Sequence, residues 1–363
     1  MRRRSLTIFI VIIQSFLFLV HWFVYFTWTR FWGPGNLKLQ IMMALLSISF
    51  VSASMLGFRY SQAAVRLFYT ISVVWLGLLS FFLLAAILCW PVYGVTRLLG
   101  FRFQPRAIAG VLFALAIAAS LYGMVNAACM RVKRISVKLP NLPDSWRGRT
   151  AALLSDTHLG HVRNYNFIRR IVGMLASLQP DVVFISGDLY DGLAADVTRL
   201  AEPWSELSVP LGAYFVAGNH DGFSGHAKHL EAVEQSGIRV LNNEKIDVDG
   251  LQIVGMHYLD SRRARSILHE ADLDRARPSI LLTHVPSGLD VAEEAGISLQ
   301  LSGHTHGGQL FPYTWICSRV WGQFNYGLKR LGNLLVYTSC GTGTWGPPMR
   351  VGTNPEIVLI EFE

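Results

Sequence analysis

Five short fragments of this chain carry side chains that could hold metal ions. Each is an apolar run that breaks into a small or Gly-rich turn bearing Asp, Asn or His, and such turns at strand ends deliver ligands to one edge of a sheet. The fragments are Ser155-Asp-Thr-His-Leu-Gly160, Ser186-Gly-Asp-Leu-Tyr-Asp191, Ala217-Gly-Asn-His-Asp221, Leu281-Leu-Thr-His-Val-Pro286 and Leu301-Ser-Gly-His-Thr-His-Gly-Gly-Gln309. Carboxylates, an amide oxygen and imidazoles together suit two divalent cations. The fragments therefore indicate metal-dependent hydrolysis.

In spacing and order these fragments resemble the calcineurin-like metallophosphoesterases. The pattern of that family runs D-x-H, G-D, G-N-H-[DE], a single H and G-H-x-H. This chain has the matching blocks in the same order: Asp156-Thr-His158, Gly187-Asp188, Gly218-Asn-His-Asp221, His284 and Gly303-His-Thr-His306. The resemblance covers roughly residues 150–340. It implies a two-sheet β-sandwich flanked by helices, with a dinuclear metal centre at its edge.

The resemblance also implies a set of metal ligands in two groups that share one carboxylate. The first ion would be held by Asp156, His158 and His306, the second by Asn219, His284 and His304, and both by Asp188. These ligand types do not distinguish Mn, Fe, Zn or similar ions, because their preferences overlap. The expected cofactor is therefore two divalent metal ions of unspecified element.

Two further residues would serve the chemistry directly. By the same resemblance His220 would remain unligated beside the scissile phosphate, where it could protonate the leaving alkoxide. Asp191 follows Asp188 by three residues and is expected to orient that histidine. The phosphoprotein phosphatases of the superfamily have Arg next, where this chain has Gly192. This departure counts against a phosphoprotein substrate.

The charge of the chain is divided between two halves. Residues 1–150 contain 16 Lys and Arg and one acid, a net charge of +15, whereas residues 151–363 contain 16 basic and 23 acidic residues, a net charge of −7. The basic excess flanks apolar segments, which is typical of membrane topology. Strong nucleic-acid binding is not expected, because contacts to a phosphate backbone need clustered Lys and Arg.

Four segments without Asp, Glu, Lys or Arg are long enough to cross a bilayer as helices. They lie at about 5–29, 39–58, 67–96 and 107–130, so residues 1–130 form the predicted four-helix transmembrane region of a multi-pass membrane protein. With the N-terminus inside, nine basic residues fall on the inner side and five on the outer side. This count places the catalytic domain in the cytoplasm.

The remainder of the chain predicts an α/β metallophosphoesterase domain over 150–363, after a basic connector at 131–149. Alternating strands and helices indicate a layered domain with ligands at the carboxyl ends of its strands. Strands are expected at 150–155, 182–186, 213–217, 252–255, 279–283, 298–302, 334–338 and 357–360. Helices are expected at 166–178, 196–207, 227–236 and 287–295.

An aromatic run directly after the last metal motif suggests what the substrate is attached to. The run contains Phe311, Tyr313, Trp315, Trp321, Phe324 and Tyr326 and carries little charge. It predicts either a loop folded onto the core or an apolar lip that touches the bilayer or an acyl chain.

We therefore expect a membrane-anchored phosphoesterase that acts on a phosphomonoester, a phosphodiester or a pyrophosphate, and the second reading of the aromatic run favours a lipid-linked substrate. Two alternatives remain: a nucleotide phosphodiesterase or nuclease-like enzyme, and a catalytically inactive membrane scaffold.

Overall fold

The structure, a computed structural model, describes residues 3–222 and 226–363. The chain divides into two compact units. The first comprises Met1–Val125 with Gly346–Met349, and the second comprises Asn126–Trp345 with Arg350–Glu363. Each unit is described separately.

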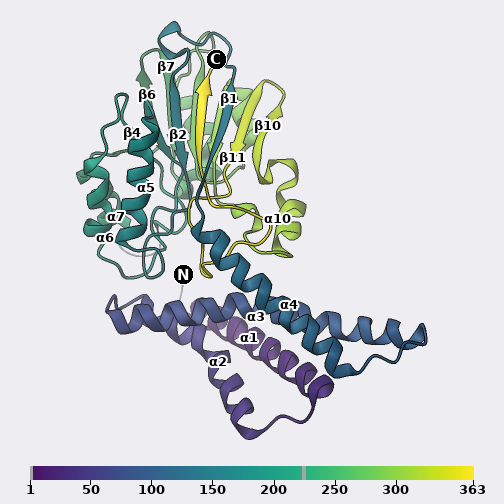
Figure 1. The fold of residues 1–363 in the computed structure, drawn as a ribbon. Coiled ribbons are helices and arrows are strands. Elements are labelled where there is room, and N and C mark those ends of the chain that lie inside the picture. The colour runs from purple at the N-terminus through teal and green to yellow at the C-terminus, as the bar shows by residue number, and fades with distance from the viewer. Residues whose placement is uncertain (1–2, 223–225) are drawn as a thin grey trace. The chain divides into compact units, whose positions relative to one another are not determined.

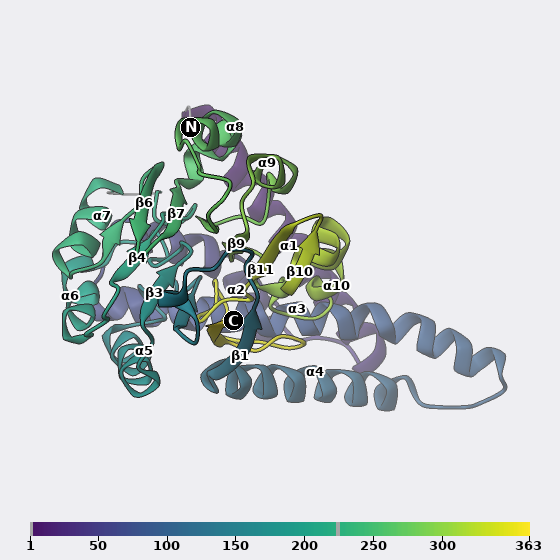
Figure 2. The same cartoon turned by 90° about the horizontal axis from the view of Figure 1, so that it is seen from above.

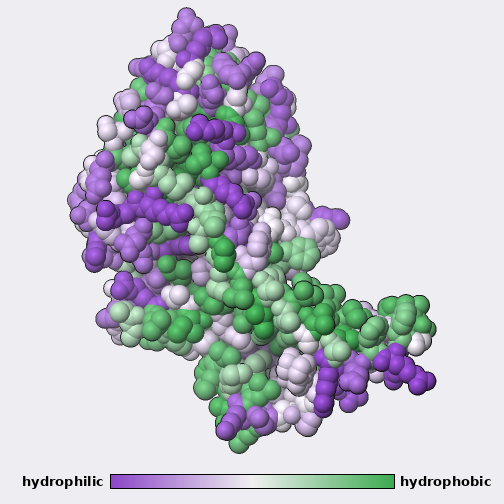
Figure 3. Space-filling model, in the orientation of Figure 1, coloured by the Kyte–Doolittle hydropathy of each residue, from purple (hydrophilic) through white to green (hydrophobic). Residues whose placement is uncertain are grey.

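The first unit consists of four long apolar helices: α1 (Arg3–Trp32), α2 (Leu37–Gly57), α3 (Ala63–Leu98) and α4 (Pro105–Ala128), the last turn of which belongs to the second unit. All four are long and apolar enough to cross a membrane. On the face shown in Figure 3, hydrophobic residues predominate on these helices, with some hydrophilic patches, whereas hydrophilic residues are frequent on the second unit. The four predicted spans are therefore present as four candidate membrane helices.

Two six-stranded sheets form the second unit (Figure 1). In spatial order the first sheet contains β1 (Arg131–Val137), β12 (Glu356–Phe362), β2 (Thr150–Leu154), β3 (Val182–Ile185), β4 (Ala213–Phe215) and β5 (Arg239–Val240). The second contains β10 (Gly327–Leu331), β11 (Leu334–Thr338), β9 (Leu299–Ser302), β8 (Ser279–Thr283), β7 (Leu251–Met256) and β6 (Glu244–Val248). Neighbours from β2 to β5 are parallel, as are those from β7 through β8 and β9 to β11.

The two sheets are buried on both faces, which explains why their strands are continuous apolar runs. In β2, Ala151 and Leu153 point into the core between the sheets, while Ala152 and Leu154 point to the outer side. The outer side of the first sheet is covered by α5 (Tyr165–Leu178), α6 (Val197–Ala201) and α7 (His226–Gln235). The helices α8 (Ala264–Glu270) and α9 (Leu289–Ala295) cover the second sheet (Figure 2). This is the helix-flanked, two-sheet fold that the resemblance implied.

The structure contains several elements that were not expected from the sequence. The segment 131–149, expected as a connector, instead begins with β1, which pairs in parallel with β12 at the edge of the first sheet. Its closely spaced basic residues Arg131, Lys133 and Arg134 obscured the strand, because they interrupt the apolar pattern of an edge strand. Strands β5, β6 and β10 and the helices α8 and α10 (Tyr313–Trp321) were also not expected.

Candidate metal centre

All five motif fragments lie at the carboxyl ends of neighbouring parallel strands. Asp156 and His158 follow β2, Asp188 follows β3, and Asn219 follows β4, in the first sheet. His284 follows β8, and the two histidines of the last motif follow β9, in the second sheet. Because parallel strands end at the same edge of a sheet, side chains more than 100 residues apart in the chain converge there.

Many of these turn residues have an unusual backbone conformation. Asp156, His158, Asp188, His304 and His306 all have φ between +48° and +71°. Non-glycine residues rarely adopt this left-handed region, although Asp and His are among those that enter it most often. Strain of this kind concentrates at functional sites. In these turns the left-handed backbone conformation directs the side chain over the sheet edge immediately after the strand ends.

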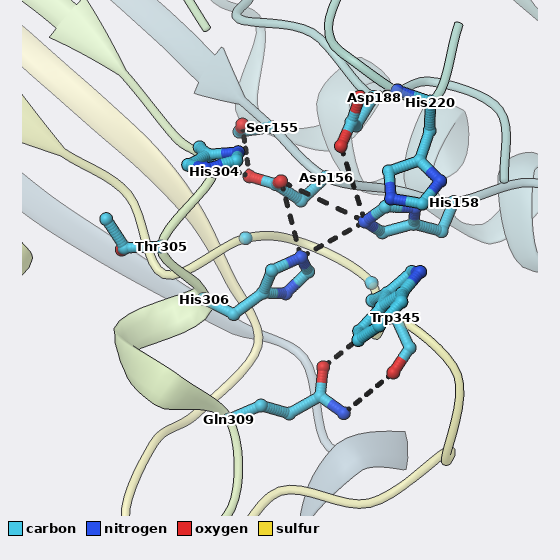
Figure 4. A network of polar contacts seen from close by, with 12 residues as sticks. Ser155, Asp156, His158, Asp188, His220, His304, Thr305, His306, Gln309 and Trp345 are labelled. Atoms are coloured by element: carbon cyan, nitrogen blue, oxygen red, sulfur yellow. Dashed lines mark hydrogen bonds and ion pairs between the residues drawn. The ribbon is translucent and has the colours of Figure 1, made fainter. Parts of the chain in front are cut away.

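One group of ligand atoms gathers around Asp156, His158 and His306 (Figure 4). His306 Nε2 lies 3.3 Å from Asp156 Oδ1 and 3.1 Å from His158 Nε2. His158 Nε2 lies 3.8 Å from Asp188 Oδ2. These are the four residues that the sequence assigned to the first metal ion.

The second group gathers on the other side of Asp188. His284 Nε2 lies 3.2 Å from Asp188 Oδ2 and 3.0 Å from Asn219 Oδ1. His304 Nδ1 lies 3.0 Å from Asn219 Oδ1 and 3.2 Å from His284 Nε2. Asp188 Oδ2 therefore belongs to both groups, and all seven expected ligands come together.

The spacing of several of these atoms is compatible with shared metal ligation. Two ligand atoms that are each about 2.0–2.1 Å from one ion lie roughly 2.9–3.4 Å apart in octahedral or tetrahedral geometry. The nitrogen pairs at 3.1 and 3.2 Å lie in that range. In the part of the chain that the structure describes, buried Asp156 Oδ1 has no hydrogen-bond partner. Such an atom is costly to bury unless a cation contacts it.

The protonation of three of the four ligand histidines also suits ligation. Burial acts to lower the pKa of His284, but neighbouring Asp188 outweighs it and raises this pKa to about 9, so an ion would have to displace the proton of that ring. Burial lowers the pKa of His158 to about 3 and that of His304 to about 4, and it lowers the pKa of His306 well below its usual value. These rings are therefore neutral at physiological pH, which is the form that binds metals.

The two carboxylates of the centre have opposite pKa shifts. Burial acts to raise the pKa of Asp188, but the neighbouring His284 outweighs it and holds this pKa well below its usual range. Burial raises the pKa of Asp156 to about 6. The shared carboxylate is consequently the one that stays ionised most readily, as a bridge between two cations requires.

His220 lies beside the first group, and one ligand atom each of His158, Asp188 and His220 lie within 4.8 Å of one another, although the sequence assigned His220 to neither ligand set. Its ring centroid is 4.9 Å from that of His158, and its main-chain N–H donates to Asp188 Oδ1. His220 Nδ1 lies 3.1 Å from the main-chain carbonyl oxygen of Asp191. Because a carbonyl only accepts, Nδ1 carries a proton in this contact. Burial lowers the pKa of the His220 ring.

Asp191 thus contacts His220 through its main chain. Its carboxylate turns away and accepts the N–H groups of Leu193 and His161. Burial raises the pKa of this carboxyl to about 7. Asp221, which follows His220, instead organises the backbone: it accepts the N–H groups of Asp188, Tyr190 and Gly218.

Two glycines of the motifs are required by close approach. A Cβ added at Gly218 would lie 2.2 Å from Asp188 Oδ1, and one at Gly303 would lie 1.7 Å from Ser155 Oγ. Both distances are far below contact. The glycines allow the loops after β4 and β9 to reach the carboxylates of the loops after β3 and β2.

Several residues that the motifs did not single out complete the centre. Fully buried Arg350 donates to the carbonyl oxygens of Cys340, Gly341 and Gly343 and lies 3.5 Å from His306 Nδ1. Trp321 packs edge-on to His304, with ring centroids 5.8 Å apart. The motifs gave no signal for these residues, because they come from the chain after the last motif.

The aromatic run after the last motif divides between the two interpretations. Phe324 packs against the outer core of the second sheet, and Tyr326 donates to Glu356. Phe311, Tyr313 and Trp315 are exposed, together with Ile316 and Val320 on α10. The run is therefore part core and part exposed apolar surface.

Comparison with known proteins agrees with the geometry. A family model described as Calcineurin-like phosphoesterase matches residues 150–308. "Transmembrane protein with metallophosphoesterase domain" from Danio rerio is 37% identical over 262 residues, which cover 66% of this chain and 59% of that protein. Its namesake from Bos taurus is 33% identical over 263 residues, with the same coverage.

A bacterial relative matches over nearly its whole length. The "Uncharacterized metallophosphoesterase" of Aquifex aeolicus is 30% identical over 261 residues, which cover 69% of this chain and 98% of that protein. The chain thus spans 59% of the length of the Danio and Bos relatives but almost all of the Aquifex one. With its five motif blocks and its four candidate membrane helices, the chain belongs to the calcineurin-like phosphoesterases, as a member with apolar helices before the phosphoesterase domain.

Proposed function

We propose that this chain is a membrane-anchored phosphoesterase that uses two divalent metal ions to hydrolyse a phosphomonoester, a phosphodiester or a pyrophosphate. The observation that carries the proposal is Asp188 Oδ2, which lies 3.2 Å from His284 Nε2 in one ligand group and 3.8 Å from His158 Nε2 in the other. A shared carboxylate between two sets of buried imidazoles is the arrangement that a two-metal hydrolase needs.

In this proposal Asp156, His158 and His306 hold one ion, Asn219, His284 and His304 hold the other, and Asp188 bridges them. When bound, two such ions lower the pKa of a water and neutralise charge on the phosphoryl oxygens. As an imidazolium, with its Nδ1 proton held by the carbonyl of Asp191, His220 would give its Nε2 proton to the leaving oxygen as the P–O bond to that group breaks. The oxygen of water would form the new P–O bond and release a proton to solvent, from which His220 would be protonated again.

We further propose that the substrate is linked to a lipid. The support is the exposed apolar face of α10, where the side chains of Trp315 and Val320 are 58% and 70% accessible. This helix packs beside the loop of the last metal motif, and Cys317 contacts the carbonyl of Thr305. An exposed apolar face next to a polar centre is typical of a surface that receives acyl chains.

The hydrolytic activity is tested with the full-length protein in detergent. Loaded with Mn²⁺, it should hydrolyse p-nitrophenyl phosphate or bis(p-nitrophenyl) phosphate, lose the activity to EDTA and regain it when Mn²⁺ is restored. Absence of hydrolysis with Mn²⁺, Fe²⁺, Zn²⁺, Co²⁺ and Ni²⁺ alike would leave the inactive scaffold as the better description.

A further inference from the structure

An exposed tryptophan stands next to the proposed proton donor. The ring centroid of Trp345 lies 5.8 Å from that of His220, with the two planes inclined by 54°. The side chain is 56% accessible, so much of its surface is open to a ligand. A large aromatic side chain left exposed beside buried ligands calls for an explanation, because burial of its apolar surface would stabilise the fold.

The main chain of Trp345 is held from both sides by one amide. Gln309 Oε1 accepts the N–H of Trp345 at 3.0 Å, and Gln309 Nε2 donates to the carbonyl oxygen of Trp345 at 3.0 Å (Figure 4). Gln309 follows the last metal ligand, His306, by three residues. The position of Trp345 is therefore tied to the metal motif itself.

The residues before Trp345 are fixed against the same centre. Gly343 N–H donates to the carbonyl oxygen of Asp156 at 2.9 Å, and buried Arg350 donates to the carbonyl oxygen of Gly343 at 2.7 Å. A Cβ at Gly343 would lie 2.2 Å from the carbonyl oxygen of Thr157, so the segment around Gly343 packs directly against the loop after β2. An exposed side chain on so constrained a backbone is preorganised for binding.

We propose that Trp345 binds the leaving group of the substrate and that Gln309 is the positioning residue that holds it there. The inference rests on the proposed function, in which His220 protonates the leaving oxygen. A group attached to that oxygen lies on the His220 side of the centre, next to the indole. An indole gains most from a flat or apolar partner, so the preferred substrate is a phosphoester whose leaving alcohol presents an aromatic or apolar face.

Turnover of two soluble esters tests this assignment without any lipid. Phenyl phosphate and methyl phosphate differ in the group that would meet the indole, and both release phosphate. Trp345→Ala should lower kcat/KM for phenyl phosphate by about 10-fold relative to wild type, while the value for methyl phosphate stays within about 2-fold. Trp345→Phe should restore most of the loss, because a ring remains.

The role of Gln309 is tested by a double-mutant cycle. Gln309→Ala should cause the same selective loss of turnover on phenyl phosphate. The double variant Trp345→Ala with Gln309→Ala should lose little more than either single variant, because each change removes the same contact between the indole and the leaving group. Metal content per chain is measured for each variant and should match wild type. Equal losses on the two esters would show that these residues only support the fold of the centre, which overturns the proposal.

A binding measurement separates this inference from the proposed function. The Mn²⁺-loaded wild type should bind benzylphosphonate about 10-fold more tightly than methylphosphonate, and Trp345→Ala should remove that preference. Hydrolysis without any aromatic preference would overturn the role of Trp345 and leave the phosphoesterase intact. Aromatic preference in binding without any turnover would support the role of Trp345 and overturn the phosphoesterase activity. Failure to bind either phosphonate would contradict both proposals.

Discussion

The histidines of the centre differ in the contacts that fix their protonation. The rings of His158 and His306 are buried and neutral, and their Nε2 atoms lie 3.1 Å apart. His220 instead has its Nδ1 proton directed to the carbonyl of Asp191. We therefore expect residues of one type to serve two functions in this centre, because their hydrogen bonds differ.

His220→Ala should separate proton transfer from metal binding. Activity on an aryl phosphate should fall by ~10²–10⁴-fold, because general-acid assistance is lost, while both metal ions remain bound. Activity and metal content are measured on the same preparation. Loss of an ion in this variant would identify His220 as a ligand and refute its assignment as the proton donor.

Asp191→Asn should change the pH dependence of stability more than it changes activity. Burial raises the pKa of this carboxyl to about 7, so between about pH 4 and 7 the native state holds a proton that the unfolded chain releases. The protonated carboxyl makes its full contribution to the free energy of unfolding below about pH 4. That contribution decreases as pH rises from about 4 to 7, by up to about 1.4 kcal/mol per pH unit, and is lost above this range. Asparagine does not ionise, so the variant lacks this pH-dependent contribution to stability.

Thermal unfolding of the metal-free protein in detergent measures this effect. The difference in melting temperature between Asp191→Asn and wild type should be more favourable to the variant at pH 8 than at pH 5. The same difference at both pH values would mean that the wild-type carboxyl is not buried in a neutral form. Activity should remain, because the carbonyl that orients His220 is retained.

At the scale of elements, the sequence located the strand ends well but the exposed elements poorly. Strands such as β3 and β8 are buried on both faces, so their apolar runs were evident, and each motif residue was correctly placed after such a strand. Strand β1 was hidden by its closely spaced Arg and Lys residues, and α10 by an aromatic run that fits a loop equally well. Nor could the sequence reveal that Gln309 contacts Trp345, 36 residues later, because that pairing exists only in the folded chain.

The exposed face of α10 predicts a difference between lipid and soluble substrates. Trp315→Ser with Val320→Ser should impair turnover of a lipid-linked phosphoester in vesicles several-fold more than turnover of p-nitrophenyl phosphate, because these side chains point away from the core. Trp321 is left unchanged, since its ring contacts His304. Equal effects on both substrates would remove the main support for a lipid-linked substrate.

At the scale of the whole molecule, the opposite charges of the two halves suit different surroundings. Residues 1–150 carry a net charge of +15 and residues 151–363 one of −7, and the basic residues of the first range lie near the ends of the four candidate membrane helices and in 131–149. The nine-to-five distribution of basic residues predicts a cytoplasmic phosphoesterase domain. A C-terminal reporter pair, one enzyme active only in the cytoplasm and one active only outside it, checks this orientation. Activity of the second reporter alone would reverse the predicted topology.

The central claim is that Asp188 joins two metal sites, and metal content per chain tests it most directly. After loading with Mn²⁺ and removal of excess metal, the full-length protein should contain about two ions per chain, and Asp188→Asn should contain markedly fewer, because the shared ligand loses its charge. Elemental analysis against protein concentration gives this ratio. A wild-type value near zero, or one that Asp188→Asn leaves unchanged, would contradict the two-metal centre.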